Sequence, residues 1–180
     1  MEELITERLI LRQWRKSDLK DLYEYAKSEL VGPNAGWPAH KNEEESKKVL
    51  DIYIKFKDLY AIVLKSENKV IGNIGFHKST LDENPLNLNQ RQLGFSLNYK
   101  YWGREIMPEA VKCLLEYGFT KLNLDLIWCN HYDFNNNSKR VLQKCGFKYN
   151  FTKKINLDLL DNKEVTALYY SILKSEYTNN

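Results

Sequence analysis

The stretch LGFSLNYKYWGREIMPEA, residues 93–110, decides the fold of this chain. Its first part alternates apolar and polar side chains, which predicts a strand over residues 90–97. A loop containing Gly103 follows, and a run with helical apolar spacing predicts a helix from Pro108 to about Leu122. A loop that leads into a helix N-terminus is a candidate anion site, because the first N–H groups of a helix have no partner within it.

Several residues of this loop favour a phosphate ligand. Gly103 lets the backbone approach closely, and Lys100 and Arg104 would add positive charge. Pro108 suits the first helical turn, where its missing N–H is not needed. Taken alone, an ordinary strand-to-helix connection is the favoured interpretation, since the stretch contains neither GxxxxGK[ST] nor GxGxxG.

A second stretch, NHYDFNNNSKRVLQKCGF over residues 130–147, also carries polar residues close together. It predicts a strand end, a polar loop and a short helix over residues 136–144 that a glycine ends. Asn135 or Asn136 can cap that helix, and Ser138 can lie in its first turn. Taken alone, helix capping explains these residues.

The other elements follow from periodicity and turn residues. Strands are expected over residues 4–14, 60–64, 70–77, 124–129, 149–157 and 163–173, the last two joined by a turn at Asp161-Asn162, with loops over residues 31–38 and 81–89. One helix is expected after Ser17-Asp18, with apolar positions through Leu30. A second is expected after Asn42, with a buried stripe of Val49, Ile52, Tyr53 and Phe56. The helix from Pro108 is expected to turn Val111, Leu114, Leu115, Gly118 and Leu122 inward. The order is not a regular βαβ alternation. We therefore expect a mixed α/β fold of α+β type, with a mostly antiparallel sheet and one parallel crossover.

The composition excludes several classes of protein. A length of 180 residues predicts one domain over residues 1–180 that needs no disulfide or metal staples. The formal net charge of +3 argues against a nucleic-acid partner. A mean hydropathy of -0.58 without a long apolar run argues against a membrane span. Residues 1–8 carry no secretory signal, so we expect a cytoplasmic protein. The abundance of Lys over Arg is taken as a sign of an AT-rich bacterial genome.

The cysteines and histidines are too scattered to predict a metal site. The cysteines are three in number, an odd count, and no CxxC or metal-type Cys/His spacing occurs. We therefore expect buried thiols and no metal. The residues concerned are Cys113, Cys129, Cys145, His40, His77 and His131.

Together the two stretches resemble the Gcn5-related N-acetyltransferase superfamily, and within it the branch typified by ribosomal-protein N-terminal acetyltransferases. The likeness rests on GF.L....WG, PEA and N..S..VL.K.GF in that order, on ERLILRQWRKSDLKDLYEY at residues 7–25, and on Gly36-Trp37. It implies the acyl-CoA N-acyltransferase fold and acetyl-CoA as cosubstrate. It also implies direct acetyl transfer to a primary amine, on a protein N-terminus or on a small molecule such as an antibiotic or polyamine. A homodimer is left open.

The resemblance assigns cosubstrate-binding residues. Acetyl-CoA would lie in a V-shaped gap between the strands over residues 90–97 and 124–129, opened by a bulge near Gly94. The pantetheine arm would pair with backbone groups of Phe95, Ser96 and Leu97, and an N–H there would polarise the thioester carbonyl. The pyrophosphate would bind a loop made of Tyr101, Trp102, Gly103, Arg104, Glu105, Ile106 and Met107. Asn135 and Ser138 would contact the cosubstrate near its sulfur.

Three positions depart from the family pattern. Glu105 replaces a small residue of the pyrophosphate loop, so its carboxylate must point away from the phosphates, and Arg104 would offset its charge. Leu142 stands where many members place a tyrosine acid, which leaves Ser138 as the substitute proton donor. Gln92 stands where the branch often has a glutamate base, and an amide accepts no proton at neutral pH.

The base is therefore not assigned by the sequence. His77 and His131 are the candidate replacements, and a water relay is an equal alternative. Trp37 is either a wall of the acceptor site or loop packing. Two rival functions remain from the departures above: a non-catalytic acyl-CoA-binding regulator, and a protein-interaction domain that has lost the cosubstrate.

Overall fold

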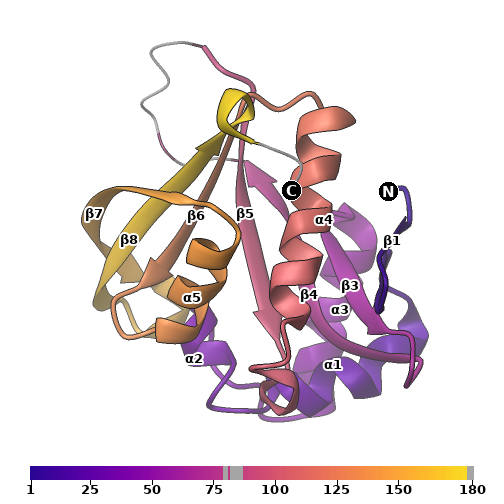
Figure 1. Ribbon diagram of the computed structural model, residues 1–180. Coiled ribbons are helices and arrows are strands. Elements are labelled where there is room, and N and C mark those ends of the chain that lie inside the picture. The colour runs from indigo at the N-terminus through magenta and orange to yellow at the C-terminus, as the bar shows by residue number, and fades with distance from the viewer. Residues whose placement is uncertain (79–80, 82–86, 178–180) are drawn as a thin grey trace.

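The computed structural model describes residues 1–78, 81 and 87–177 (Figure 1). Its strands are β1 (Leu4–Ile5), β2 (Leu9–Arg12), β3 (Leu59–Leu64), β4 (Lys69–Lys78), β5 (Gln90–Leu97), β6 (Leu126–Tyr132), β7 (Lys148–Leu157) and β8 (Lys163–Leu173). Its α-helices are α1 (Leu19–Ala26), α2 (Gly32–Ala35), α3 (Glu43–Phe56), α4 (Ile106–Thr120) and α5 (Asn136–Lys144). Most of the loop expected over residues 81–89 lies outside the described residues.

The strands form one sheet in the order β1-β2-β3-β4-β5-β6-β8-β7. Every pairing is antiparallel except that of β5 with β6, which confirms the expected mixed sheet with one parallel crossover. The parallel pairing covers only Gln90–Gln92 against Leu126–Trp128. Beyond it the two strands diverge toward the N-terminal end of α4, as Figure 1 shows. The gap expected between these strands is therefore present.

Side chains of β3 show how the sheet is covered on both faces. Tyr60, Ile62 and Leu64 belong to the core cluster that includes the buried face of α4. Ala61 and Val63 belong to the cluster formed with α1 and α3. Successive side chains of a strand point to opposite faces, so a strand buried on both faces reads as a continuous apolar run. This explains the sequence YAIVL at residues 60–64.

Two of the expected strands differ from the observed ones by more than a residue at an end. The strand expected over residues 4–14 is two strands, because Thr6 turns the chain back: its N–H donates to the Leu9 carbonyl, and its hydroxyl accepts from the Leu9 N–H. The strand expected over residues 124–129 is β6, shifted so that it includes His131 and Tyr132. Its pairing with β8 extends the strand through residues that looked like a polar loop.

The helices also differ from expectation in their bounds. The first begins with a short 3-10 turn, Lys16–Asp18, and ends at Ala26, leaving Leu30 exposed. The loop expected over residues 31–38 contains α2, with a proline in its first turn. The helix expected from Pro108 begins two residues earlier at Ile106.

The buried faces of α3 and α4 correct the expected apolar stripes. In α3 the buried residues are Ser46 and Leu50, while Ile52 and Phe56 are exposed. Leu122 lies beyond the end of α4 and is also exposed. Apolar spacing alone places a stripe only to within about one helical position, and packing against α1 decides which residues face inward.

The expected bulge near Gly94 is not found, since the register between β4 and β5 runs without a shift through Gly75 opposite Gly94. The strands separate because β6 leaves β5 after Gln92.

No helix in the described part of the chain is long and apolar enough to cross a membrane.

Candidate active site

A cavity of about 280 Å³ lies between the C-terminal end of β5 and helix α5. The N-terminal end of α4, the exposed face of α5 and the short helix α2 complete its walls. It brings together every residue that the sequence assigned to the cosubstrate: Phe95, Ser96, Leu97, Tyr101, Trp102, Gly103, Arg104, Glu105, Ile106, Met107, Asn135 and Ser138. Their roles in binding stay predictions.

Backbone N–H groups are concentrated at one end of this cavity. Glu105 is the N-cap of α4, so its N–H and those of Ile106 and Met107 have no acceptor within the helix. The N–H groups of Gly103 and Arg104 also find no acceptor among the described residues. Unpartnered N–H groups at a helix N-terminus, reinforced by the helix dipole, are donors suited to phosphate oxygens.

Gly103 is the residue that makes this loop accessible. Its φ of +76° belongs to the left-handed region, and an added Cβ would meet nothing within 4 Å. The restriction is therefore conformational, because side chains are strained at this φ, while the space above the backbone is open. The open space allows an anionic ligand to approach the N–H groups closely.

The cations that line the cavity differ from those expected. Lys100 does not line the cavity. Its Nζ lies 3.1 Å from Oε1 of Glu24, so its charge is paired there and does not add to the loop as expected. Arg104, Arg140 and Lys144 are the lining cations. Arg140 and Lys144 were missed, although their spacing of four residues along α5 places them on one helical face.

Glu105 adopts the left-handed conformation, with a φ of +57°, at the N-cap of α4. Its carboxylate pairs with Lys144 of α5, across the cavity. Arg104, expected to offset this charge, instead lies over the ring of Tyr101 with its Cζ 5.2 Å from the centroid. The acidic side chain is therefore neutralised from another element of the fold.

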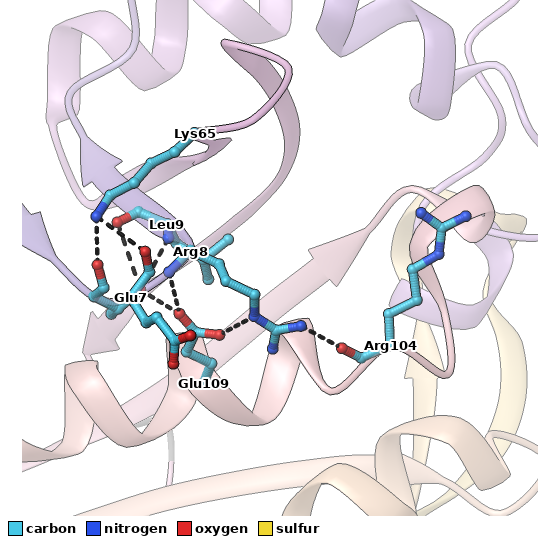
Figure 2. Close-up of polar contacts among 7 residues, drawn as sticks. Glu7, Arg8, Leu9, Lys65, Arg104 and Glu109 are labelled. Carbon is cyan, nitrogen blue, oxygen red and sulfur yellow. Dashed lines mark hydrogen bonds and ion pairs between the residues drawn. The ribbon is translucent and has the colours of Figure 1, made fainter.

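Residues far away in the sequence hold the loop in place (Figure 2). Arg8, in the turn before β2, donates from Nη1 to the carbonyl oxygen of Arg104 at 2.8 Å. Its Nε lies 2.6 Å from Oε2 of Glu109, and its backbone N–H donates to Oε1 of the same carboxylate. In a trans peptide the C=O and the next N–H point in opposite directions. Fixing the Arg104 carbonyl toward Arg8 thus directs the Glu105 N–H away from Arg8.

The edge of β5 supplies further backbone groups. Asn98 donates its N–H to the Ile71 carbonyl of the segment that forms β4, so alternate residues of β5 are hydrogen-bonded to β4. The backbone groups of Phe95 and Leu97 then face the gap left by β6. The Leu97 carbonyl accepts from Nε1 of Trp102 at 2.9 Å. The backbone N–H and C=O of Phe95 and the N–H of Leu97 are thus free to form hydrogen bonds with an extended ligand, which would lie beside β5 where a neighbouring strand would otherwise pair.

A smaller cavity, of about 120 Å³, adjoins the first. The two share Asn34, Ala35, Phe95, Asn135 and Ser138 as lining residues. The rest of the smaller cavity is lined by His77, Gln92, Leu93, Gly94, Cys129, Asn130, His131 and Tyr132. The shared lining places two compartments next to each other at the point where β5 and β6 separate.

Asn135 and Ser138 lie at the junction of the two cavities. Asn135 is the N-cap of α5: its Oδ1 accepts from the Ser138 N–H at 3.0 Å, and its Nδ2 donates to the Asn34 carbonyl. The capping expected from the sequence is thus present. The Ser138 hydroxyl has no hydrogen-bond partner among the described residues. It remains available to a ligand.

The two histidines named as candidate bases lie on opposite faces of the sheet. His131 is 4 % exposed, its Nδ1 lies 2.8 Å from the Tyr132 carbonyl oxygen, and its Nε2 is 3.4 Å from the Tyr170 hydroxyl. His77 is at the exposed end of β4, opposite Gln92. Burial of its ring lowers the pKa of His77, although the charge of Asp58 opposes this effect.

Trp37 does not line either cavity. It packs over Gly32, where an added Cβ would lie 2.6 Å from the Trp37 carbonyl oxygen, and its ring is 5.3 Å from that of His40. Of the two roles considered for Trp37, a wall of the acceptor site or packing within its loop, this placement favours packing within the loop. Asn34 and Ala35, from the same segment, reach the cavities instead.

In the described part of the chain, no group of three or more His, Cys, Asp or Glu side chains is arranged to hold a metal.

A strand gap with a phosphate-type loop at one end and a second cavity beside it defines the class of acyl-coenzyme A-dependent transferases. A family model described as an acetyltransferase (GNAT) domain matches residues 8–148. The chain belongs to this family, whose members use acetyl-CoA as cosubstrate.

Known proteins resemble the chain over nearly its whole length. An uncharacterized N-acetyltransferase, p20, of Bacillus licheniformis is 25 % identical and covers 98 % of this chain and 99 % of its own length. The crystal structure of a GNAT-family acetyltransferase from Bacillus anthracis covers 97 % of this chain and 100 % of its own, with a TM-score of 0.85 and 24 % identity. The crystal structure of a ribosomal-protein-S5-alanine acetyltransferase from Vibrio fischeri covers 99 % of this chain and 100 % of its own, with a TM-score of 0.75 and 21 % identity. At these identities the structures establish the fold, and the family supports acyl transfer as its chemistry.

The residues present fit the cosubstrate. Its phosphates need N–H donors and cations, which the loop before α4 and the α5 side chains supply. Its pantetheine amides need a strand edge, which β5 offers at Phe95 and Leu97. The carboxylate of Glu105 is the unfavourable group, and Lys144 balances it.

Proposed function

We propose that the protein is an acetyl-CoA-dependent N-acetyltransferase that acetylates a primary amine directly, in a ternary complex. The observation that carries this proposal is the junction of the two cavities at Phe95, Asn135 and Ser138. One cavity has the donors for a nucleotide diphosphate and a pantetheine arm. The other would open beside the end of that arm, so both reactants could be held together, which would remove much of the entropic barrier to reaction.

The cosubstrate supplies an activated acetyl thioester. The N–H groups of residues 103–107, with Arg140 and Lys144, would hold its phosphates. A backbone N–H of β5 at Phe95 or Leu97 would donate to the thioester carbonyl and stabilise the charge that develops on its oxygen. Ser138, with its hydroxyl at the junction, would deliver a proton to the departing sulfur. Asn135 would position Ser138 by capping α5.

The acceptor would enter the smaller cavity, which Gln92, Asn130 and Tyr132 line with neutral polar groups. Two acceptor classes follow from the proposal: a protein N-terminus and a small-molecule amine. The Vibrio fischeri relative, titled a ribosomal-protein-S5-alanine acetyltransferase, supports including peptides with N-terminal alanine among the candidates.

A ligand-dependent melting experiment tests cosubstrate binding first. Saturation at 100 times Kd should stabilise the protein by about 2.7 kcal/mol. Release of free thiol is then followed over a panel of N-terminal peptides, polyamines and aminoglycosides. A ternary complex gives intersecting double-reciprocal plots, whereas a covalent acetyl-enzyme gives parallel ones.

The rival functions give different results in the same experiments. A non-catalytic regulator would melt at a higher temperature with acetyl-CoA but release no thiol with any amine. An interaction domain without a cosubstrate would show no melting shift at all. Either result would contradict the proposed function.

A further inference from the structure

His77 and Gln92 form a pair that faces the smaller cavity. They are directly opposite each other in the antiparallel register of β4 and β5. Side chains at opposed positions point to the same face, with their Cβ atoms about 4.5–5.5 Å apart. Both residues line the smaller cavity. One titratable and one amide side chain therefore lie side by side where the acceptor would enter.

Gly94 provides the space for the His77 ring. A Cβ added at Gly94 would lie 2.9 Å from Nε2 and 3.1 Å from Cδ2 of His77, closer than real Cβ atoms approach. The imidazole thus lies over Gly94, next to Phe95, whose backbone faces the gap. Only a residue without a side chain leaves Nε2 this close to the cavity junction.

The surroundings of His77 keep its ring available as a base. No hydrogen bond to the ring is present in the described part of the chain. Its β5 neighbours Gln92 and Gly94 carry no charge, and Asn34 and Ala35 of α2 are neutral as well. Asp58, before β3, is the charged group that acts on the ring, and it only partly offsets the lowering of the pKa of His77 by burial. Desolvation of the ring therefore favours its uncharged form, which is the form that can accept a proton.

Gln92 has a fixed orientation. Its Nε2 donates to Oδ1 of Asn130 on β6 at 2.7 Å. Because the amide plane is thereby set, Oε1 is directed away from Asn130 and can accept a hydrogen bond. An ammonium or amine can donate to this oxygen.

We propose that His77 Nε2 is the base that removes a proton from the acceptor ammonium, and that Gln92 Oε1 holds the resulting amine. This assignment rests on the proposed function and deepens it. The imidazole lone pair takes one proton, which later passes to solvent. The nitrogen lone pair attacks the carbonyl carbon, a C–N bond forms, and the C–S bond breaks with its electron pair on sulfur. The Ser138 hydroxyl gives its proton to the thiolate and takes up the second nitrogen proton, so the products are the amide and the free thiol.

The pH dependence of kcat/KM tests the assignment. In the wild type, kcat/KM should decline as pH falls below the pKa of His77, which burial lowers from its ordinary value. His77→Gln should lower kcat/KM at pH 7 by about 10²–10⁴-fold. In this variant only free amine reacts, so kcat/KM should rise tenfold per pH unit up to the pKa of the amine. Added imidazole should restore part of the activity of His77→Ala.

Two controls separate a catalytic role from a structural one. Lys78→Ala changes the next residue, which points to the other face, and should keep the wild-type profile. Gly94→Ala keeps the imidazole but displaces it, and should lower kcat while the dissociation constant for CoA is unchanged. NMR titration of the ligand-free protein should report a ring pKa for His77 below that of an ordinary histidine, independently of activity.

The outcomes distinguish this assignment from the proposed function. If the wild type turns over and His77→Gln keeps its rate and pH profile, His77 is not the base, although the acetyltransferase proposal stands. If the wild type neither binds acetyl-CoA nor releases thiol, both proposals fail. An His77→Gln protein that also loses CoA affinity would contradict the assignment, because His77 does not line the larger cavity.

Discussion

Replacing Arg8 with alanine tests how the loop before α4 is held. The substitution removes the contacts from Nε to Glu109 and from Nη1 to the Arg104 carbonyl, while the backbone N–H of residue 8 can still reach Glu109. The Arg104 carbonyl would then be free to rotate. Because the Glu105 N–H belongs to the same peptide unit, it would lose its direction too.

The magnitude follows from the exposure of the pair. The side chains of Arg8 and Glu109 are 40 % and 18 % exposed, so the pair lies between an exposed ion pair of about 0–1 kcal/mol and a buried one of about 3–5 kcal/mol. We expect Arg8→Ala to destabilise the protein by about 1–2 kcal/mol, or roughly 2–8 °C in Tm. Loss of one oriented hydrogen bond to phosphate should raise the Kd for acetyl-CoA by about tenfold.

Calorimetric titration with acetyl-CoA and thermal melting measure the two effects separately. Lys65→Ala is the matched control: Lys65 contacts the Thr6 and Glu7 carbonyls of the same turn but does not contact α4 (Figure 2). It should leave the Kd unchanged. If Arg8→Ala lowers Tm but changes the Kd by less than twofold, the reasoning that Arg8 orients the loop is refuted.

Three further predictions concern other charges and the proposed acid. Glu105→Gly should tighten acetyl-CoA binding several-fold, since it removes a side chain from a left-handed position and frees Lys144; unchanged affinity in calorimetry would contradict this. Contacts led by Lys69 lower the pKa of Glu24 from 4.5 to about 2, so its stabilisation is present above pH 4.5 and is lost as pH falls toward 2. In Glu24→Gln, the free energy of unfolding should therefore fall by on the order of 2 kcal/mol less than in the wild type as the pH is lowered, which acid unfolding followed by circular dichroism measures. Ser138→Ala should lower kcat by about tenfold or more with unchanged Kd for CoA; undiminished turnover would remove its assigned role.

Local sequence signals predicted most of the elements but not all of their bounds. The turn at Asp161-Asn162 was identified correctly, since both residues adopt positive φ. The two-strand N-terminus was missed because its turn depends on Thr6 and on contacts with α4, about 100 residues away. The α3 stripe was misplaced because packing against α1, and not apolar spacing, selects Ser46 and Leu50.

The candidate site shows the same division. The residues that the two motifs assigned to the cosubstrate all line the larger cavity, because each motif is local and encodes a loop, a cap or a strand edge. The lining cations Arg140 and Lys144 were missed. The partner of Glu105 was not predicted, since Lys144 comes from another helix. The choice between His77 and His131 also needed the strand pairing, because it depends on which face each side chain occupies.

The sequence alone determined the family, most of the order of the elements and the residues of the strand-loop-helix motif, because these depend on contacts between neighbours along the chain. Only the tertiary structure decided which charges meet, which carbonyl Arg8 holds, and which face of the sheet each histidine occupies. The physical reason is the range of the interactions. Hydrogen-bonded turns and caps act within a few residues, whereas ion pairs and cavity walls form wherever packing of the sheet and helices brings distant side chains together.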